Sequence, residues 1–196
     1  SDLFAMLKRR FIPVLFLQDG WMVRSELFKT HQIIGSPAVH VERMVEWDVD
    51  ELIVIDISSG GTTKFDHGRL DHRDRGGPAN FNEFISFISS ECRIPLAIGG
   101  RIRSLADITE RIKRGADKVC VNHMILNDAP TVTEAAKQFG SQAIVASIDY
   151  RIIDGQAVVF TEHGTLNTGR PALDVARQAR DMLSGEIFLN AIDRDG

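Results

Sequence analysis

An aspartate at the end of an apolar run is the residue of this sequence best suited to chemistry. Residues 143–149 read AIVASID, so Asp149 ends a run of apolar residues, and the turn signal Asp154-Gly155 follows soon after. Such a run is typical of a strand that is buried on both faces and carries its polar residue at the C-terminal end. A carboxylate placed there can act as a general acid or base. The alternative is a carboxylate that caps a helix or turn.

A second run of the same kind lies near the start of the chain. Residues 11–20 read FIPVLFLQDG, again an apolar run that leads to an Asp-Gly pair, here Asp19-Gly20. The two segments indicate an approximate repeat of half the fold. Within that repeat Phe16 falls near the place of Asp149. One half therefore carries an acid where the other carries a phenyl ring, and we expect this ring to pack in the core.

Six strand-like runs alternate with helical patterns and would position these residues. The runs are 11–17, 51–57, 94–100, 117–122, 143–149 and 186–193, with a further strand-like piece at 156–164. The helical patterns cover 37–47, 80–90, 105–114, 129–139 and 171–183, with Ser104 as an N-cap and glycines 115 and 140 as stops. This alternation predicts parallel strands that are joined by helical crossovers.

Two α/β architectures compete, a doubly wound open sheet and a (β/α)8 TIM barrel. Polar or small residues end the strands repeatedly: Asp56, Gly99, Gly100, Asn122, Asp149, Asp193 and Asp195. In a barrel all strand ends converge on one face, whereas in an open sheet only those at the switch point meet, so we favour the barrel. Because a barrel needs two more strands, we expect residues 1–196 to form a single, incomplete barrel domain that ends after strand six.

The composition excludes several classes of protein. The 196 residues are 43% hydrophobic, which suits one domain with a sizeable core. A net charge of -4 argues against nucleic-acid or anionic-membrane binding. No run approaches the roughly 18 apolar residues of a membrane span and no signal peptide is visible, so we expect a cytoplasmic protein. Two cysteines make no disulfide framework, and Cys120 is predicted to be a small buried hydrophobe.

Residues 58–80 form the one long stretch without apolar periodicity, which indicates a functional or disordered loop. It holds several residue types that bind metals: His67, His72, Asp66, Asp71 and Asp74. Their spacing matches no metal motif, so we predict a solvated mobile loop and no metal site. Nothing else in the sequence indicates a cofactor.

Six segments together resemble a known family. RRFIPVLFLQDG, VDELIVIDI, IPLAIGG, RGADKVCVN, FGSQAIVASIDY and GEIFLNAIDRDG, in this order, are similar to the cyclase subunit (HisF-like) of imidazole glycerol phosphate synthase. The resemblance covers nearly the whole chain. It implies a (β/α)8 barrel of two similar halves, with strands seven and eight absent from this chain. It further implies that ammonia from a glutaminase partner closes an imidazole ring on a phosphorylated nucleotide substrate.

The resemblance implies a pair of catalytic aspartates at the ends of strands one and five. Asp149 corresponds to the strand-five acid, but Phe16 stands at the strand-one position, and a phenyl ring cannot transfer protons. The resemblance also implies a basic residue nearby, usually a lysine, and this chain has Arg24 at that position. We therefore expect a diverged paralogue. Relatives with an apolar residue at this position are associated with surface-polysaccharide genes and with the formation of an amidino sugar.

The resemblance also implies a phosphate site at the glycine pair 99–100 and Asn122, where backbone N–H groups and an amide approach an anion. Arg101 replaces a third glycine and His123 replaces a small hydroxyl residue, so Arg101 either holds the phosphate or fills its place. The glycine pair could equally serve only a tight turn. The predicted substrate-binding residues are Gly99, Gly100, Arg101, Asn122, Arg24, Asp56 and Asp195.

Four charged residues precede or open strands one, two, four and six: Arg10, Glu51, Lys118 and Glu186. The resemblance implies that they form the charged gate through which ammonia enters the barrel. The alternative is ordinary solvated charge beside strands. We predict a retained gate in which opposite charges pair across a narrow mouth, as exposed pairs worth about 0–1 kcal/mol each.

Two classes of function remain open. The first is an enzyme, a lyase or cyclase subunit of a glutamine amidotransferase complex, with a phosphorylated or nucleotide-linked acceptor and Asp149 as acid and base; a true histidine-pathway cyclase is the alternative. The second is a catalytically silent or truncated barrel that serves as a scaffold for a glutaminase. If the chain ends at Gly196, strands one and six would be unpaired edges, which favours self-association.

Overall fold

The computed structural model describes residues 9–26, 30–58 and 78–194. The helices are α1 (Pro37–Glu46), α2 (Phe81–Glu91), α3 (Leu105–Lys113), α4 (His123–Asn127), α5 (Ala129–Phe139), η2 (Ser141–Ala143) and α6 (Ala172–Asp181). The strands are β1 (Val14–Gln18), β2 (Trp21–Glu26), β3 (Thr30–Gly35), β4 (Leu52–Asp56), β5 (Leu96–Gly99), β6 (Lys118–Val121), β7 (Ile144–Ile153), β8 (Gln156–Thr161), β9 (Leu166–Pro171) and β10 (Glu186–Ala191).

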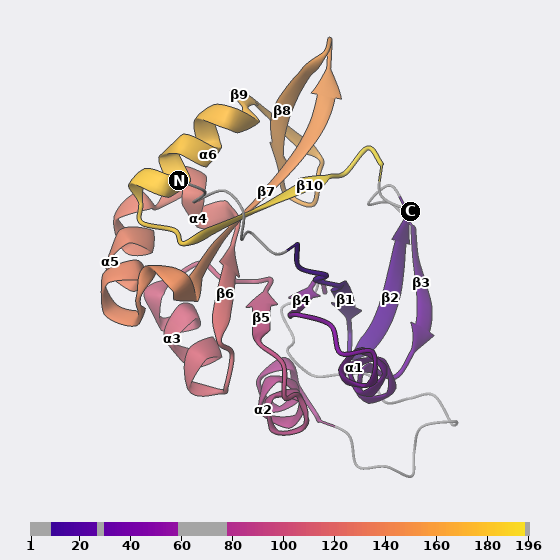
Figure 1. Ribbon diagram of the computed structural model, residues 1–196. Coiled ribbons are helices and arrows are strands. Elements are labelled where there is room, and N and C mark those ends of the chain that lie inside the picture. Colours follow the sequence, from indigo (N-terminus) through magenta and orange to yellow (C-terminus); the bar gives the residue numbers. More distant parts are fainter. Residues whose placement is uncertain (1–8, 27–29, 59–77, 195–196) are drawn as a thin grey trace, which may run out of the picture.

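The centre of the fold is a parallel sheet in the order β1-β4-β5-β6-β7-β10. These strands are the six predicted runs, and helices occupy all five predicted helical segments, so the predicted alternation is confirmed. Among the described residues no hydrogen-bonded ladder joins β10 to β1, and the sheet is therefore not closed into a barrel by hydrogen bonds. Figure 1 shows that the sheet curls, with the helices on its outer side.

Two β-hairpins extend the parallel sheet at corresponding points, after β1 and after β7. Both turn at an Asp-Gly pair with positive φ, at Asp19 (49°) and Gly20 (89°) and at Asp154 (50°) and Gly155 (80°). Left-handed geometry at both positions is that of a type I′ turn, which matches the twist of the flanking strands. The two hairpins fit the half-fold repeat that the sequence predicts.

The β2–β3 pair is not among the strands that the sequence predicts. Three consecutive side chains of β2 are buried, those of Trp21, Met22 and Val23. The alternation of buried and exposed residues expected of a half-buried strand is therefore absent there. A register shift between Met22 and Val23 in the pairing with β3 breaks the pattern further.

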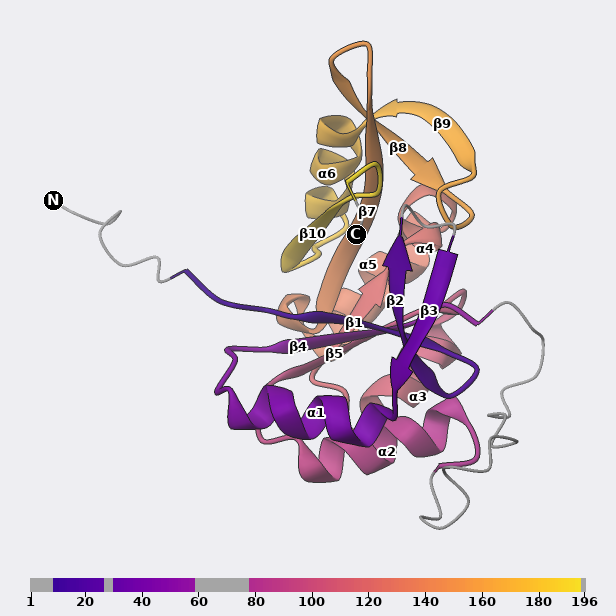
Figure 2. The same cartoon turned by 90° about the vertical axis from the view of Figure 1, so that its right-hand side faces the viewer.

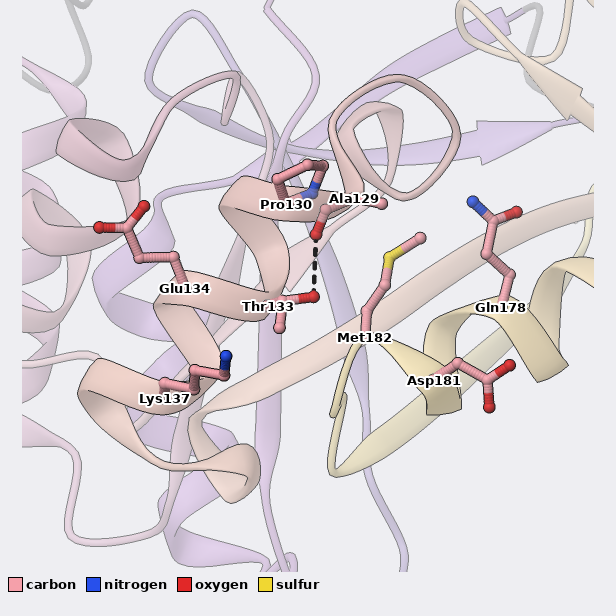
Figure 3. Close-up of a pocket in the computed structure, with 8 residues that line it drawn as sticks. All are labelled: Ala129, Pro130, Thr133, Glu134, Lys137, Gln178, Asp181 and Met182. Carbon is pink, nitrogen blue, oxygen red and sulfur yellow. Dashed lines mark hydrogen bonds between the residues drawn. The ribbon is translucent and has the colours of Figure 1, made fainter.

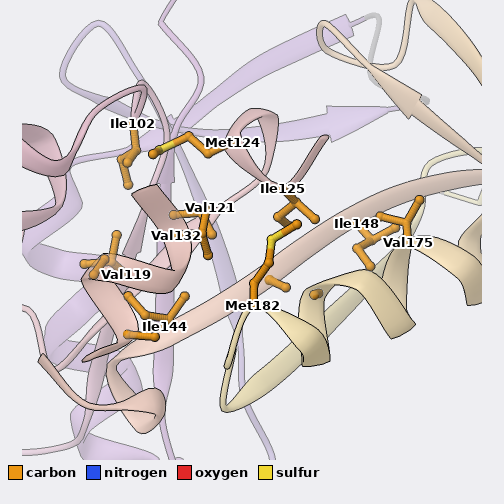
Figure 4. Packing of buried hydrophobic residues seen from close by; sticks show 14 of the residues in the cluster. Ile102, Val119, Val121, Met124, Ile125, Val132, Ile144, Ile148, Val175 and Met182 are labelled. Atoms are coloured by element: carbon orange, nitrogen blue, oxygen red, sulfur yellow. The ribbon is translucent and has the colours of Figure 1, made fainter. Parts of the chain in front are cut away.

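Apolar side chains between the helices and the sheet form the larger part of the core. One cluster joins α3, α4, α5 and α6 to β6 and β7, and Figure 4 shows Val119, Ile144 and Met182 within it. A second cluster joins α1 and α2 to β1, β4 and β5, and Figure 2 shows these helices beneath the strands. Both stabilise the outer face of the sheet and leave its inner face for a site.

The predicted start and stop signals of the helices are confirmed at α3 and α5. The hydroxyl of Ser104 accepts a hydrogen bond from the Asp107 N–H at 3.2 Å, as an N-cap does. Gly115 follows α3 with φ 109° and Gly140 follows α5 with φ 93°, conformations that L side chains rarely adopt.

The expectation that strand one is an unpaired edge is wrong. Phe16 to Gln18 pair with β2 on one side of β1, while β4 pairs with the other side. Within the described ranges β10 pairs only with β7, and its Ile187 and Leu189 side chains are 42% and 53% exposed. Self-association through such an edge stays a prediction.

Neither cysteine forms a disulfide, and Cys120 is fully enclosed, as predicted. Burial raises the pKa of its thiol to about 12, so it is an inert packing residue rather than a nucleophile. Across the described ranges, no helix combines the length and apolar character that a bilayer crossing requires.

Candidate functional site

Side-chain alternation decides which residues face the inside of the curled sheet. A small interior cluster contains one residue or more from each parallel strand: Val14, Ile53, Ile55, Ala97, Cys120, Val145 and Phe188, with Ile12 beside them. Since alternate residues of a strand point to the same face, Phe16 lies on the side of Val14 and Asp149 on the side of Val145. Both residues therefore face the interior, toward the C-terminal ends of their parallel ladders.

Asp149 is held between two amides from the neighbouring strands. The Asn190 side chain donates to Asp149 Oδ1 at 2.9 Å, and the Asn122 side chain donates to Oδ2 at 3.2 Å. Asn122 also donates to the Ser147 carbonyl at 3.0 Å, which fixes its orientation. Asp149, Asn122 and Asn190 are called the Asp149 cluster below. It lies where three parallel strands end.

Burial raises the pKa of Asp149, and the two amides and the charge of His163 offset part of that rise. The amides carry no charge, so they orient the carboxylate without supplying the opposite charge that would strongly favour its ionised form. A carboxyl group whose pKa is raised in this way exchanges protons more readily near neutral pH. The Asp149 cluster can therefore accept or donate a proton.

The glycine pair at the end of β5, Gly99 and Gly100, is required by close approach of other atoms. Gly100 has φ 95°, and a Cβ added there would lie 2.1 Å from the carbonyl oxygen of Asp56. A Cβ on Gly99 would lie 3.0 Å from the Cβ of Cys120. Steric crowding in a tight turn is therefore enough to explain why both positions are glycine. The same turn leaves Arg101 with φ 56° and its Nη1 atom 3.9 Å from Asp56 Oδ2.

Asp56 is not brought together with Asp149. Leu52 and Val54 pack toward the helices, and alternation turns Asp56 to that same outer face. Its Oδ1 accepts from the Ser58 N–H at 3.0 Å and from the Ser58 hydroxyl at 2.6 Å. Burial raises the pKa of Asp56, and the Ser58 hydrogen bonds and the Arg101 charge offset part of this.

Other predicted substrate-binding residues lie apart from the Asp149 cluster or outside the description. Arg24 is exposed on β2, and its Nη2 atom lies 3.6 Å from Glu26 Oε1. Asp193, which was predicted only as a polar residue at a strand end, accepts a hydrogen bond at Oδ2 from the Ile152 N–H at 3.2 Å, which ties the segment after β10 to β7. Asp195 and the loop residues 59–77, with both of their histidines, lie outside the described residues.

At the opposite end of the strands the four predicted gate residues form one closed ring of ion pairs. Arg10 contacts Glu51 and Glu186, each at 3.1 Å. Lys118 contacts Glu51 at 2.8 Å and Glu186 at 2.6 Å. Arg10, Glu51, Lys118 and Glu186 are called the charge ring below. Since Arg10 precedes β1 and Glu186 opens β10, the ring brings the first and sixth parallel strands together.

The expectation of exposed pairs is wrong for part of the ring, because Glu51 is only 2% exposed. Burial would lower the pKa of Lys118, but hydrogen bonds to Glu186 and Glu51 outweigh it and raise that pKa. Burial would raise the pKa of Glu186, but hydrogen bonds from Lys118 and Arg10 outweigh it and lower that pKa. The hydrogen bond to Glu186 raises the pKa of Arg10. Each charge stabilises its neighbours.

A shallow groove between α5 and α6 does not involve the predicted site (Figure 3). It is lined by residues of the outer helical layer: Ala129, Pro130, Thr133, Glu134, Lys137, Gln178, Asp181 and Met182. Within the part of the chain that is described, no three His, Cys, Asp or Glu side chains are grouped to hold a metal ion.

Sequence reasoning missed Asn190 and the turn after β8. Asn190 lies two residues beyond Phe188, an interior residue, so strand alternation could have placed it beside Asp149. The charge of His163, in the turn after β8, lowers the pKa of Asp149, and no local signal in the sequence predicts this effect because it depends on the pairing of β7 with β8.

Comparisons with known proteins identify the relatives of this chain. Residues 10–196 match the family described as "Histidine biosynthesis protein". The imidazole glycerol phosphate synthase subunit HisF of Exiguobacterium sp. is 35% identical over 97% of this chain and 69% of its own length. HisF of Sulfurisphaera tokodaii is 33% identical, over 97% and 71%. A Pseudomonas aeruginosa protein, provisionally named subunit hisF2 of the same synthase, is 36% identical, over 97% and 71%.

Proposed function

This chain belongs to the histidine biosynthesis protein family, as a HisF-like cyclase chain, and on that premise we propose that it is the ammonia-using subunit of a glutamine amidotransferase pair. Ammonia released from glutamine by a partner subunit reacts with a phosphorylated or nucleotide-linked acceptor at the C-terminal ends of the strands. Asp149 moves the protons of that reaction. The single observation that carries the proposal is an inward-facing carboxylate, oriented by two amides, whose pKa is raised by burial.

The position of Phe16 supports an acceptor other than the nucleotide of histidine synthesis. Phe16 faces the same interior as Asp149 and puts an aromatic surface where proton transfer would need an acid. When ammonia adds to the carbonyl carbon of an N-acyl group, one carboxylate can take a proton from the nitrogen and return it to the oxygen that leaves as water, so a single carboxylate suffices for that reaction. We therefore infer a diverged paralogue that forms an amidino group on a sugar of a surface polysaccharide.

The turn after β5 supports binding of a negatively charged acceptor. Arg101 lies beside Asp56 at 3.9 Å, too long for a normal hydrogen bond, and a phosphate can compete for its guanidinium. Asn122 already donates hydrogen bonds to Asp149 and to the Ser147 carbonyl. In this proposal it therefore orients the carboxylate and does not bind the phosphate. In this proposal Arg101 takes over the role that a third glycine would have in the family.

Ammonia supply through the charge ring follows from its position. The ring lies at the N-terminal ends of the strands, and the interior cluster of small and apolar residues, Ala97, Cys120 and Val145 among them, connects that end to Asp149. A glutaminase that docks at this end would deliver ammonia to a ring that is closed by its own ion pairs. Uncharged ammonia then passes along apolar side chains more easily than ammonium does.

The decisive experiment compares acceptors in the presence of the glutaminase partner and glutamine. Turnover is expected with a nucleotide-linked sugar that carries an N-acyl group, whose carbonyl oxygen leaves as water when ammonia adds, and is expected to require ammonia. Efficient imidazole formation from the histidine-pathway nucleotide would replace this assignment with that of a true cyclase. Glutaminase activation without ammonia-dependent turnover of any acceptor would show that the chain is a scaffold for its glutaminase partner and not an enzyme subunit.

The charge ring has its own test, the product formed per glutamine hydrolysed compared with the product formed from ammonium salts. Lys118→Ala and Glu51→Ala are expected to lower the product formed per glutamine hydrolysed. The product formed from ammonium salts is expected to stay largely unchanged. Arg114→Ala removes a surface ion pair to Glu110 at 2.8 Å and serves as the matched control. Equal loss with glutamine and with ammonium would assign the ring to folding alone.

A further inference from the structure

Arg151, near the end of β7, is a half-buried cation whose charge the described part of the protein does not neutralise. Among the described residues no carboxylate forms an ion pair with it, and its Nε atom is buried without a hydrogen-bond partner. A buried N–H group of this kind is costly, because it has lost its water and gained no acceptor in return. Such a group in a folded protein therefore requires an explanation, and a bound ligand is one.

Strand geometry places Arg151 on the same face of β7 as Asp149. Ile148 and Tyr150 pack against the helices, so the residues that alternate with them face the interior of the curled sheet. Arg151 follows Asp149 on that inner face, with the two Cα atoms about 6–7 Å apart along the strand. Phe160 of β8 is paired with Asp149 and so faces the same side. The guanidinium carbon of Arg151 lies 4.9 Å from the centre of the Phe160 ring.

Two contacts hold the guanidinium of Arg151 in place. The ring of Phe160, which is itself only 7% exposed, covers one face of it. On another side the turn after β8 comes close, since a Cβ added to Gly164 would lie 3.6 Å from Arg151 Nη2 and 2.7 Å from Ile192 Cδ1. Stacking on a ring leaves the donors in the plane of the guanidinium free to bind an anion. The group is therefore pre-organised for an oxyanion.

The carboxylates at this end of the sheet have other partners. Asp149 accepts hydrogen bonds from two amides. Glu162 Oε1 lies 3.5 Å from Nδ1 of His123. Asp193 Oδ2 accepts a hydrogen bond from a backbone N–H of β7 at 3.2 Å. The positive charge of Arg151 is therefore left for a ligand that reaches the interior face above Asp149.

We propose that Arg151 binds an oxyanion group of the acceptor, a phosphate or a carboxylate, next to the carbon that reacts at Asp149. This inference rests on the proposed function and names a feature of the acceptor that the proposed function leaves open. Arg101 follows β5, which is separated from β7 by β6, so the two strands are about 10 Å apart. Two arginines at this spacing suit an acceptor that carries two anionic groups, one on each side of the reacting carbon.

The first test follows arginine Nε–H signals by NMR while inorganic phosphate or acetate is added to the protein. The Arg151 signal, identified by its loss in Arg151→Lys, is expected to shift and to saturate with at least one anion, because the buried N–H gains an acceptor. Arg180, whose Nε–H donates to Asp181 at 3.1 Å, is the internal reference, and chloride at matched ionic strength is the control.

The two anions separate the possible sources of the oxyanion. A larger shift with phosphate assigns a phosphoryl group to this position, and a larger shift with acetate assigns a carboxylate. The inference is overturned if Arg151 shows no saturable shift with either anion, as expected when only water occupies the position. A shift equal to that of Arg180, or equal to that with chloride, would also overturn it.

The second test measures turnover of the acceptor with ammonium salts, so that the glutaminase is not involved. Arg151→Met keeps an apolar stem against Phe160 and removes the charge, and KM for the acceptor is expected to rise about 10- to 100-fold with little change in kcat. Arg151→Lys should recover part of this loss as a point charge. Arg177→Met, which removes an exposed pair with Asp174 at 3.4 Å, is the matched control.

The kinetic test also separates binding from a purely structural role. An unchanged KM in Arg151→Met, with a loss of kcat that follows the loss of folded protein in denaturant unfolding, would make Arg151 a packing residue and overturn the inference. If no acceptor turns over in the wild type, the proposed function fails, whereas the anion titration still decides whether Arg151 binds an oxyanion.

Discussion

The two ends of the curled sheet place carboxylates in opposite electrostatic states. In the charge ring Glu186 accepts hydrogen bonds from Lys118 and Arg10, which outweigh burial and lower its pKa. In the Asp149 cluster the partners are amides, so burial prevails and the pKa of Asp149 is raised. Strand geometry is the same at both ends. The difference lies in whether a cation or a neutral donor faces the acid.

This difference separates structural from chemical use of a charge. A carboxylate within a ring of ion pairs stays ionised and holds neighbouring strands together, whereas one with neutral partners is poised to exchange a proton. Each variant below changes one end and leaves the other as an internal reference.

The largest effect is expected from Asp149→Asn. Loss of the acid–base group should reduce ammonia-dependent kcat by ~10²–10⁴-fold. The free energy of unfolding at pH 7 should instead rise by about 1 kcal/mol, because a neutral amide is cheaper to bury than a carboxylate. Kinetic assays and denaturant unfolding of the same samples check both results. Parallel loss of stability would show that Asp149 is a structural residue.

Gly100→Ala should be the most destabilising change at the Asp149 end of the sheet. The new methyl group would lie 2.1 Å from the Asp56 carbonyl in a backbone with φ 95°, so the free energy of unfolding should fall by about 3 kcal/mol or more. Gly155→Ala is the matched control, since its φ is 80° but no atom lies within 4 Å, and about 1 kcal/mol is expected. Similar losses for both would show that backbone conformation, not the approach to Asp56, matters.

Lys118→Ala tests how far the charge ring stabilises the fold. It leaves the buried Glu51 with Arg10 as its remaining ring partner, so the free energy of unfolding should fall by ~1–3 kcal/mol, more than a surface pair contributes. Denaturant unfolding beside the Arg114→Ala control measures the difference. If the free energy of unfolding falls no more than in the control, the charge ring contributes no more to stability than an ordinary surface ion pair does.

The two ends should respond to pH in opposite directions. The pKa of Glu186 is lowered in the folded state, so its contribution to stability is present above its ordinary value of 4.5 and is lost as the pH falls through the folded value. The pKa of Asp149 is raised, so stability declines as the pH rises from 3.8 to the folded value. Unfolding measured from pH 3 to 8 should therefore show a flatter acid limb in Glu186→Gln and a flatter rising-pH limb in Asp149→Asn.

The smallest functional effect is expected from Phe16→Asp. The new carboxylate would face Asp149 across the interior, but in a space shaped by an aromatic ring, so imidazole formation should be weak at most. The assay uses the histidine-pathway nucleotide, ammonium salts and the full-length protein. Efficient imidazole formation by the unmodified protein would show that the absent acid is dispensable and would refute the paralogue assignment.

Local patterns in the sequence determined most of the elements. The six apolar runs became the parallel strands, and the caps at Ser104 and Gly140 lie where they were predicted, because hydrophobic periodicity and backbone sterics act over a few residues. The family resemblance, carried by ordered motifs, is supported by the match over residues 10–196. It also identified the four residues that pair in the charge ring.

Only the tertiary structure decided which charges meet, and in what surroundings. Asn190 and Asp149 are brought to 2.9 Å by the parallel pairing of β10 with β7. Alternation likewise turned Asp56 away from Asp149, although both lie near the C-terminal ends of parallel ladders. The state of a carboxylate depends on burial and on neighbours that are distant in the chain, and those are properties of packing rather than of any local pattern.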